Sequence, residues 1–414
     1  MGKKEVALIG AGKIGKGYIA DLFSKAGYKM YFLCHSLRQA KELREQGYYT
    51  VFKFTGNDGQ ISQYRIEGFE AYSTEEEFSQ CADVLCKVNY ATVHVYKNAF
   101  EDVSRLLAEA VKRRVSNGIH DTLDVILCIN YRDTDLIFSE YIRGFLDTQE
   151  EMDYFDKFVG IGMALTFRLG TDPNEEMLSI DRNCVCVAES PDLPVDREAF
   201  KGEIPEGVAL RPLSGMRERI IYKLWCGNVR GAITSCIALK KGYVYTADAI
   251  ADNEVYIATV LGTREAQFGF DQEFKLSDEA KAETFSSRRS GSEEKKSGLG
   301  RHIDTCARVA ADPVRKLARR DRLTGPALGV IKGGRIPFFL SRAIACYFYY
   351  YNENDPGTVT VQDYIKKNGI SKAVERFCEL DLSDDTDRTL HELVLSQYYD
   401  MYDKEIDSIN ELLT

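Results

Sequence analysis

The first third of the chain alternates short apolar runs with longer segments in which apolar residues recur every three or four positions. The runs at residues 6–9 and 30–34 contain few polar side chains, which is typical of strands buried on both faces. Between them, Ile14, Tyr18 and Leu22 are spaced as one face of a helix. This order of strand, helix and strand predicts an α/β fold built on a doubly wound parallel sheet.

The same patterns extend the sheet along the chain. Strand-like apolar runs occur at Ala82–Val88, Leu123–Asn130, Phe158–Leu169 and Ser179–Val187, and an amphipathic helix is expected at Ala99–Arg114. Residues 48–72 instead alternate polar and apolar side chains around Gly56–Gly59, which predicts a hairpin inserted in the sheet. Asn89 and Asn130 lie at the ends of two expected strands, which places each of them either beside a bound ligand or in a turn.

A second, mainly helical region follows a turn-rich boundary. The boundary is the segment Pro191–Pro205, in which prolines recur. Helical spacing is then found at Met216–Leu239, Ala247–Phe268, Asp278–Ser287, Asp312–Arg320 and Pro337–Tyr351. We therefore predict an α/β domain with extra strands at residues 1–205 and an α-helical domain at residues 206–414. Ser286–Gly300, rich in serine, glycine and charge, is expected to be a loop or a lid.

Composition and charge exclude several classes of protein. The chain has 414 residues, of which 44% are hydrophobic and 29% charged, as in an ordinary globular protein of two domains. Its formal charge of −10 argues against nucleic acid as a partner, because binding to a phosphate backbone requires a basic surface. No apolar run approaches the roughly 20 residues that span a bilayer, and the first residues lack a signal-peptide pattern. We expect a cytoplasmic protein with a small-molecule ligand; nothing in the sequence indicates its oligomeric state.

The eleven cysteines are scattered along the chain, and several fall within or at the ends of expected strands. In a protein without an export signal, buried and reduced thiols are the expected state. None of the cysteines and histidines is spaced as a set of zinc ligands, so we predict no metal site.

The turn between the first strand and the first helix carries the pattern Gly10-x-Gly12-x-x-Gly15. Gly10 permits the tight turn, Gly12 lets the backbone approach a pyrophosphate, and Gly15 allows the helix to pack closely on the strand. The helix begins near Lys13 and Ile14, whose backbone N–H groups and the positive end of the helix dipole would hold phosphates. We predict a dinucleotide site here; the alternative is a purely structural strand–turn–helix.

The end of the second strand determines which dinucleotide is expected. An NAD site usually has an Asp or Glu there, whose carboxylate binds the ribose 2′-hydroxyl. This strand ends instead in Cys34, followed by Ser36 and Arg38, which would bind a 2′-phosphate. The expected cofactor is NADP or NAD, with NADP favoured. The alternative is that Ser36 caps the next helix and Arg38 points into solvent.

A stretch of the helical region carries candidate catalytic residues. On an α-helix, Lys223 and Asn228 lie about 140° apart with position 231 between them. A desolvated lysine takes an alcohol proton, and an asparagine amide donates a hydrogen bond to the alkoxide that forms. The alternative is an exposed lysine on a helix that packs through Gly227 and Gly231. The spacing alone does not decide between the two.

Three motifs together resemble the polyol-specific long-chain mannitol dehydrogenase family, which includes the mannitol-1-phosphate 5-dehydrogenases. They are Gly10-Ala11-Gly12-Lys13-Ile14-Gly15-Lys16-Gly17, Lys223-Leu224 with Asn228, and Asp312-Pro313-x-Arg315-Lys316-Leu317-x-x-x-Asp321-Arg322-Leu323-x-x-Pro326. The resemblance implies a Rossmann-type domain with an extended sheet, a helical substrate domain, and metal-free NAD(P)-linked interconversion of a polyol and a ketose. It also implies that Lys223 is the general base, that Asn228 stabilises the oxyanion, and that Asn130 lies near the nicotinamide.

The chain departs from the family at three places. Gly231 stands where the family has a histidine, the second strand lacks an NAD-type acid, and the run Phe158–Leu169 has no aspartate where phosphate-polyol members carry one. A glycine at position 231 leaves a void that admits a bulkier substrate, is filled by a histidine from elsewhere, or marks lost catalysis. Should Lys223 not be the base, His302 is the next candidate.

The leading hypothesis is an NAD(P)-dependent oxidoreductase acting on a polyol, a sugar acid or a phosphate of either, and on the matching ketose. The rival hypotheses are a dinucleotide-binding sensor that has lost its chemistry and a reductase of another small carbonyl compound. The cluster Arg315, Lys316, Arg319, Arg320 and Arg322 either binds a substrate phosphate or pairs with Asp312 and Asp321 on helix surfaces.

Overall fold

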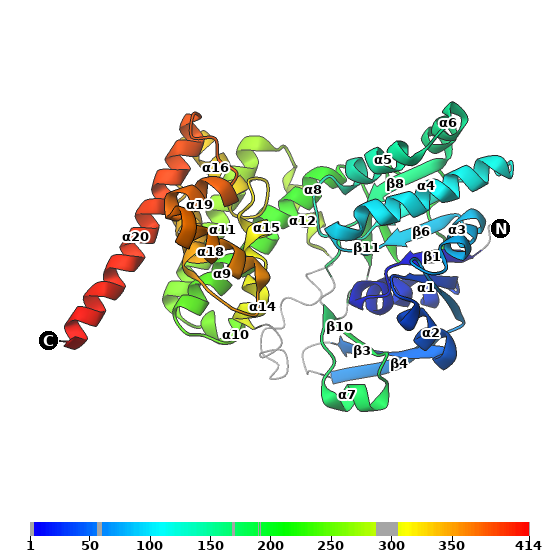
Figure 1. Ribbon diagram of the computed structural model, residues 1–414, viewed down its shortest axis with the longest axis horizontal. Helices are drawn as coiled ribbons and strands as arrows, with labels where there is room; N and C mark the ends of the chain where they lie inside the picture. Colours follow the sequence, from blue (N-terminus) through cyan, green and yellow to red (C-terminus); the bar gives the residue numbers. More distant parts are fainter. Residues whose placement is uncertain are drawn as a thin grey trace. The chain divides into compact units, whose positions relative to one another are not determined.

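The computed structural model describes residues 4–55, 60–167, 170–188, 190, 192–286 and 305–413. The turn predicted at Gly56–Gly59, the segment Ser286–Gly300 after its first residue, and His302 lie outside the described residues. The chain forms two compact units (Figure 1). The first comprises Met1–Arg217 with Ala282–Lys295, and the second comprises Glu218–Lys281 with Lys296–Thr414.

The first unit is built on a six-stranded parallel sheet with the strand order β5-β2-β1-β6-β7-β8. Its strands are β1 (Glu5–Ile9), β2 (Lys29–Cys34), β5 (Phe69–Ser73), β6 (Tyr90–Val93), β7 (Leu123–Leu127) and β8 (Val159–Met163). The strand order reverses between β1 and β6, so the switch point, where such sheets bind ligands, lies at the carboxyl ends of these two strands. This arrangement confirms the predicted doubly wound, Rossmann-type fold.

Successive residues of β1 face opposite sides of the sheet, and both sides are covered. Ala7 and Ile9 pack with helices α3 to α6, whereas Val6 and Leu8 pack with α1, α2 and a second sheet. A strand covered on both faces must be apolar at every position, which explains the run at its residues. The covering helices are α1 (Ala20–Lys25), α2 (Leu37–Gln46), α3 (Phe78–Lys87), α4 (Phe100–Ser116), α5 (Thr134–Phe145) and α6 (Gln149–Phe158) (Figure 1).

The prediction of a strand at Ala82–Val88 is wrong, because most of this segment belongs to helix α3. Cys81, Leu85 and Val88 are buried together with Ala82, a helical spacing that a short apolar run does not distinguish from a strand. Asn89 therefore precedes β6 instead of following a strand. Its side-chain amide donates to the carbonyl of Thr122 at 3.0 Å. It lies at the amino edge of the sheet, so the prediction that it lies beside a ligand is wrong.

The extra strands of the first unit form a second, four-stranded sheet with the order β4-β3-β10-β9. Strands β3 (Tyr48–Thr55) and β4 (Gln60–Glu67) are the predicted hairpin, and β9 (Gly170–Thr171) and β10 (Val185–Ala188) complete the sheet. The prediction of one strand over Ser179–Val187 is wrong in its first part, which lies in helix α7 (Glu175–Ile180). Asn174 caps that helix by accepting a hydrogen bond from the Met177 amide at 2.9 Å.

A small parallel pair lies in and after the turn-rich segment. Strand β11 (Leu193–Asp196) pairs with β12 (Leu210–Leu213). The carbonyl of Pro194 also accepts a hydrogen bond from the Leu165 amide at 2.9 Å, which ties β11 to the chain that leaves β8. Residues on both sides of position 205 are therefore joined by main-chain hydrogen bonds within the first unit.

The second unit is mainly helical, as predicted. Its elements are α8 (Met216–Tyr222), η3 (Lys223–Asn228), α9 (Val229–Lys240), α10 (Thr246–Ala249), α11 (Asn253–Glu273), α12 (Asp278–Thr284), α14 (Cys306–Ala310), α15 (Pro313–Leu317), α16 (Thr324–Lys332), α17 (Phe338–Tyr349), α18 (Pro356–Asn368), α19 (Ile370–Phe377) and α20 (Asp385–Leu413) (Figure 1). Helices α8 and α12 each cross the division between the units. Over the part of the chain that is described, no helix is long and apolar enough to span a membrane.

The core of the second unit depends on a close approach of α11 and α16. A Cβ atom added to Gly269 would lie 2.2 Å from the Pro326 carbonyl oxygen, and one added to Gly329 would lie 2.4 Å from the Gly269 carbonyl oxygen. Real Cβ contacts are never this short, so both positions require glycine. The two backbones touch, which fixes α16 and the loop before it against the helices that carry the candidate catalytic residues.

Candidate active-site residues

The predicted dinucleotide turn has an open side at Gly12. Gly10 adopts φ of 99°, a conformation that favours glycine, and its amide donates to the Leu33 carbonyl at 2.9 Å. The Gly12 carbonyl accepts from the Lys16 amide at 2.9 Å, so the amides of residues 13–15 have no acceptor within the helix. Gly12 is exposed, and a Cβ atom added to it would meet no atom within 4 Å. The turn therefore presents N–H groups at an unobstructed surface, as anion binding requires.

His94 lies beneath this turn and was not anticipated from the sequence. Its Nδ1 is 2.6 Å from the Gly10 carbonyl oxygen, and its Nε2 is 2.9 Å from the Thr92 hydroxyl. A carbonyl oxygen can only accept, so Nδ1 carries the proton and Nε2 accepts from Thr92. Burial lowers the pKa of His94 to about 4, so the ring is neutral. A Cβ atom on Gly15 would lie 2.2 Å from the Gly10 oxygen and 2.8 Å from the His94 ring, so Gly15 must be glycine.

The helix after the turn contains a π-helical segment, η1 (Gly15–Ile19), in which the Ala20 amide donates to the Gly15 carbonyl. A Cβ atom on Gly17 would lie 2.4 Å from the Val187 side chain of β10. Lys16 is buried and donates to the Asn183 carbonyl at 2.8 Å; burial lowers its pKa. The segment η1 is thus the place where the second sheet is anchored to the dinucleotide turn.

Strand β2 ends in Cys34 and not in an acid, although a carboxylate oxygen of Glu75 lies 3.4 Å from Nε2 of the next residue, His35. Cys34 is buried, and burial raises its pKa to about 12, so the thiol is neutral. Ser36 caps α2 by accepting from the Gln39 amide at 3.4 Å. The Arg38 side chain is exposed, with Nε 3.6 Å from a carboxylate oxygen of Glu42. Gln39 in turn donates to the Ala11 carbonyl at 3.2 Å, which ties this helix to the glycine turn.

Two further predicted cofactor residues lie on the same edge of the sheet as the turn. The ammonium group of Lys13 is 2.5 Å from a carboxylate oxygen of Asp172. Asn130 is exposed and follows β7 by three residues, so it lies beyond the carboxyl end of that strand. The parallel register of β1, β6 and β7 brings Gly10, His94 and Asn130 to one edge.

Lys223 and Asn228 are the first and last residues of a second π-helical segment, η3. The prediction of a regular α-helix over them is wrong, and so is the angle of about 140° between their side chains. Hydrogen bonds in a π-helix join residues five apart, so positions 223 and 228 lie closer together around the helix than they would in an α-helix. Lys223 is 6% exposed, which contradicts the alternative of an exposed lysine, and Asn228 is half-buried.

Trp225 is the largest side chain that holds η3 in place. Its indole N–H donates to the Arg320 carbonyl at 3.3 Å, and its ring meets Phe274 edge-on with centroids 5.4 Å apart. A Cβ atom on Gly325 would lie 2.4 Å from the indole, so the glycine makes room for it. The family-like motif that begins at Asp312 thus contacts the π-helical segment through main chain and glycine.

At position 231 one apolar side chain lies close to the place of a Cβ atom. A Cβ atom on Gly231 would lie 3.2 Å from Cγ1 of Val309, which belongs to helix α14. The first atom of a side chain at this position would therefore press on an apolar side chain. No histidine of the described residues makes this contact.

Lys316 of the same motif is buried and serves the local fold. Its ammonium group donates to the carbonyl of Val309 at 2.6 Å and to that of Ala311, at the carboxyl end of α14. Burial, with the neighbouring charges of Arg322 and Arg315, lowers its pKa to about 7. The two carbonyls and the negative end of the helix dipole oppose this effect by favouring the charged form.

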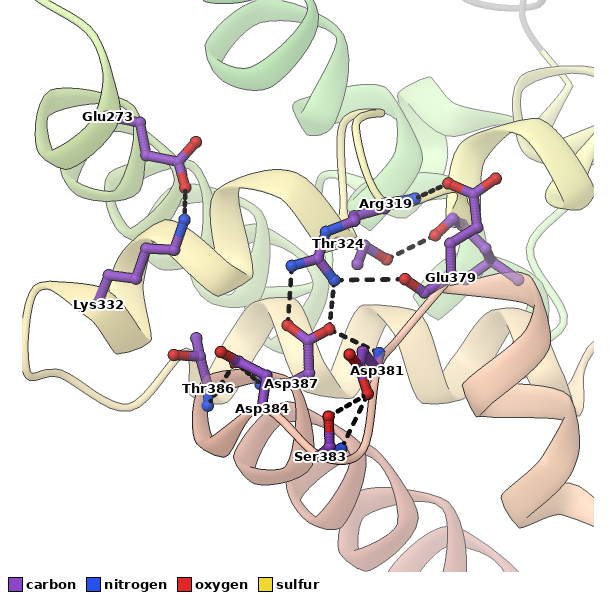
Figure 2. A network of polar contacts seen from close by, with 11 residues as sticks. Glu273, Arg319, Thr324, Lys332, Glu379, Asp381, Ser383, Asp384, Thr386 and Asp387 are labelled. Carbon is purple, nitrogen blue, oxygen red and sulfur yellow. Dashed lines mark hydrogen bonds and ion pairs between the residues drawn. The ribbon is translucent and has the colours of Figure 1, made fainter.

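Three of the four arginines of the cluster, Arg315, Arg319 and Arg322, are paired with acids, as the alternative to a phosphate site predicted. Arg315 Nε lies 2.7 Å from Asp312, and Arg322 Nε lies 2.6 Å from Asp321. Arg319 pairs with Asp387, an acid that the sequence did not suggest (Figure 2). Within the described ranges, no three histidines, cysteines or acids are grouped so that they could hold a metal ion.

Comparison with known proteins extends over nearly the whole chain. Residues 4–171 match the mannitol dehydrogenase Rossmann domain. The mannitol-1-phosphate 5-dehydrogenase of Anoxybacillus flavithermus is 24% identical over 379 residues, covering 90% of this chain and 94% of that protein. A protein of the same name from Buchnera aphidicola is 24% identical over 383 residues, covering 90% of this chain and 93% of its own length.

Solved structures show the same fold. The mannitol 2-dehydrogenase of Pseudomonas fluorescens, solved as a ternary complex with NAD and D-mannitol, superposes with a TM-score of 0.73 at 13% identity, covering 100% of this chain and 94% of that one. A D-sorbitol dehydrogenase in substrate-free form gives a TM-score of 0.69 at 13% identity, covering 95% and 93%. The sequence matches confirm the resemblance that the three motifs indicated, and the solved structures confirm the fold.

Proposed function

We propose that this chain, a divergent member of the mannitol dehydrogenase family, is an NAD(P)-dependent oxidoreductase that interconverts a polyol or sugar acid and the matching ketose. The observation that supports the proposal is the segment η3, in which Lys223 is buried and Asn228, five residues on, is half-buried. The dinucleotide turn at Gly10–Gly15 supports it, since its N–H groups face an open surface at Gly12. The protein is proposed to act in the cytoplasm.

The chain's own residues would handle the proton and the developing charge. When bound, the nicotinamide accepts or donates the hydride at C4. The neutral amine of Lys223 takes the proton of the substrate hydroxyl as the carbon is oxidised, and the ammonium form returns it in reduction. The Asn228 side-chain amide donates a hydrogen bond to the oxygen as it becomes negative. Burial favours the neutral form of a lysine, which is the form that a base requires.

The cofactor would be held by residues of the first unit. The amides of Lys13, Ile14 and Gly15 would bind the pyrophosphate, and Asn130 would lie near the nicotinamide. NADP is proposed ahead of NAD because the neutral thiol of Cys34 stands where an NAD site has a carboxylate. Ser36 and Arg38 would then contact the 2′-phosphate, which requires Arg38 to exchange Glu42 for the ligand.

A phosphate on the substrate is not required by this arrangement. The side chains of Arg315, Arg319 and Arg322 are each engaged by a carboxylate of the same unit. We therefore expect a free polyol or sugar acid to be turned over as well as its phosphate ester. Steady-state kinetics check this on a matched pair of substrates, one free and one phosphorylated. A large preference for the ester would indicate that these arginines bind the substrate phosphate.

A second candidate function is favoured by one observation. A Cβ atom added to Gly231 would lie 3.2 Å from Cγ1 of Val309, so the residue that replaces the family's histidine lies beside an apolar side chain. A protein that binds the dinucleotide and performs no turnover, a sensor, is consistent with that change. Tight binding of NADPH or NADH without turnover of any polyol, ketose, uronate or phosphate ester would establish the sensor. Turnover of a different small carbonyl compound alone would establish the third hypothesis.

The decisive variant is Lys223→Met, assayed by the absorbance of the reduced nicotinamide. Removing a general base lowers kcat by about 10²–10⁴-fold. The dissociation constant of the dinucleotide should stay nearly unchanged. The matched control is Lys240→Met, because Lys240 is exposed and its ammonium group lies 4.1 Å from the centre of the Tyr349 ring. Full activity of Lys223→Met would exclude the proposed base and direct attention to His302.

A further inference from the structure

Arg319 lies within the family-like motif that begins at Asp312, and it contacts the C-terminal helix α20 through Asp387 (Figure 2). Its guanidinium binds both carboxylate oxygens of Asp387 in the first turn of α20, with Nη2 2.9 Å from Oδ1 and Nη1 in contact with Oδ2. The Asp387 side chain is only 1% exposed, and Oδ2 also accepts from the Asp381 amide at 2.8 Å. A two-point bond to a buried carboxylate fixes the orientation of the arginine as well as its position.

The connection between α19 and α20 is shaped around the same arginine. A carboxylate oxygen of Glu379 accepts from the Arg319 amide at 3.1 Å, and the Glu379 carbonyl accepts from the guanidinium at 3.3 Å. Glu379 has φ of 52°, which is uncommon for a residue other than glycine. Such a conformation persists only where the surroundings hold it. The segment from Glu379 to Asp387 is therefore built to hold Arg319.

On its other side, the Arg319–Gly325 segment holds Trp225. The Arg320 carbonyl accepts from the indole N–H at 3.3 Å, and Gly325 leaves room for the ring, which would lie 2.4 Å from an added Cβ. Trp225 is 2% exposed and lies two residues after Lys223 within η3. A displacement of this segment would therefore be felt by the turn of the helix that carries the lysine.

We propose that Asp387 is a positioning residue for Lys223, acting through Arg319 and Trp225. The first turn of α20 holds Arg319, the segment around Arg319 holds the indole, and the indole fixes η3. The inference rests on the proposed function, in which Lys223 is the base. All four residues lie in the second unit, so the chain of contacts does not depend on the first unit. The C-terminal helix then contributes to catalysis although it carries no residue proposed to touch the substrate.

The consequence is an effect on kcat and not on cofactor binding. A displacement of about 1 Å in a catalytic group lowers the rate by about a hundredfold, because the near-attack geometry is lost. Asp387→Asn keeps the size of the side chain but removes the charge that pairs with Arg319. We expect kcat to fall about tenfold to a hundredfold while the dissociation constant of the dinucleotide is unchanged.

The chain contains one tryptophan, so its fluorescence reports directly on the surroundings of Trp225. In the Asp387→Asn protein we expect the emission of Trp225 to shift to longer wavelength and to be quenched more strongly by acrylamide. The matched control is Asp385→Asn, since Asp385 is exposed and pairs only along its own helix, with Arg388. The control should leave both the emission and kcat unchanged.

The outcomes separate this inference from the proposed function. Unchanged emission and unchanged kcat in folded Asp387→Asn overturn the inference. A changed emission with full kcat in Asp387→Asn also overturns it, when the wild type is active. A wild type without turnover overturns the proposed function, and the fluorescence still decides whether Asp387 fixes the indole. If Asp387→Asn does not fold, Arg319→Lys replaces it, because lysine keeps the charge and loses the two-point bond. Unchanged emission and kcat in Arg319→Lys would equally overturn the inference.

Discussion

Among the described residues, two segments are π-helical, η1 in the first unit and η3 in the second, and each lies in one of the three motifs that the sequence marked as functional. They are held in opposite ways. Segment η1 is held by close backbone approach, since Gly15 and Gly17 both contact atoms that no Cβ could tolerate. Segment η3 is held by a large side chain, Trp225, which lies between aromatic rings and the main chain of a distant loop.

The difference shows that a π-helical turn has two different roles in this chain. π-Helical segments are rare and are frequent at functional sites. In η1 the wide turn faces the second sheet through Lys16 and Gly17, while the proposed ligand contacts begin before it, at Gly12, and end at its first residue, Gly15. In η3 the wide turn itself carries the proposed base and its partner. Changes at η1 should therefore affect stability and cofactor binding, and changes at η3 should affect the chemical step.

The strongest test of the first half of the comparison is a pair of glycine variants in one turn. Gly15→Ala places a Cβ against the Gly10 carbonyl, so the backbone must shift, and we expect a loss of about 1–3 kcal/mol in the free energy of unfolding. Gly12→Ala meets no atom, so it should leave the stability unchanged and weaken dinucleotide binding at least about tenfold by blocking close approach. Urea denaturation and a dinucleotide titration measure the two effects. Unaltered binding by Gly12→Ala would show that the pyrophosphate does not approach this glycine.

Position 231 allows the second half of the comparison to be tested in the same manner. Gly231→His presses its Cβ on Val309, and we expect it to cost about 1–3 kcal/mol of stability through overpacking. Val309→Ala in the same protein should recover part of this loss, because residues in contact are not additive. Chemical denaturation of both single variants and the double variant gives the coupling energy. If the imidazole then reaches the substrate site, the double variant gains activity on small polyols over Val309→Ala; simple additivity would mean that the two positions do not meet.

Arg38→Ala tests whether the dinucleotide is bound at the end of β2 as well as at the glycine turn. The loss of a charged hydrogen bond should weaken NADPH by about 1–3 kcal/mol and leave NADH little changed. The dissociation constants of the two reduced cofactors are compared in wild type and variant. An equal loss for both would make Arg38 structural, in keeping with its pairing to Glu42. Much tighter binding of NADH by the wild type would refute the proposed NADP preference.

His94 should give the smallest effect. His94→Leu removes the hydrogen bond to the Gly10 carbonyl, and we expect dinucleotide binding to weaken by about 0.5–1.5 kcal/mol. His94→Asn should restore most of it, because its amide can donate to the same oxygen. The control is His391→Leu, since His391 contacts the backbone of Ser371 in the second unit and should affect stability alone.

The same histidine makes a prediction about pH. The pKa of His94 is lowered on folding from its ordinary value to about 4, so the unfolded chain binds a proton that the folded chain does not. The contribution of His94 to stability is therefore complete above pH 6.5 and is lost as the pH falls from there through about 4. His94→Asn should lose stability less steeply over this range in denaturant titrations. Identical pH profiles would show that the ring is not held neutral.

Much of the fold could be predicted because its signals are local. Strands β1, β2 and β7 are buried on both faces, which favours apolar residues at most of their positions and makes them visible as runs. The glycine turn is equally local, since each glycine is required by a neighbour within the strand–turn–helix or just beneath it. The prediction failed at Ala82–Val88, where a short helix buried by the same kind of residues has no signal that separates it from a strand. That error also concealed His94, which follows the true strand β6.

The amino-acid sequence by itself determined the parallel sheet, the dinucleotide turn and the helical second region, because periodic burial and glycine spacing are properties of neighbouring residues. Only the tertiary structure decided the rest. Three features depend on residues far apart in the chain. They are the packing of η3 through Trp225, the closeness of Val309 to position 231, and the bond between Arg319 and Asp387. Such contacts depend on which helices pack together and how closely, and no spacing within one segment encodes that choice.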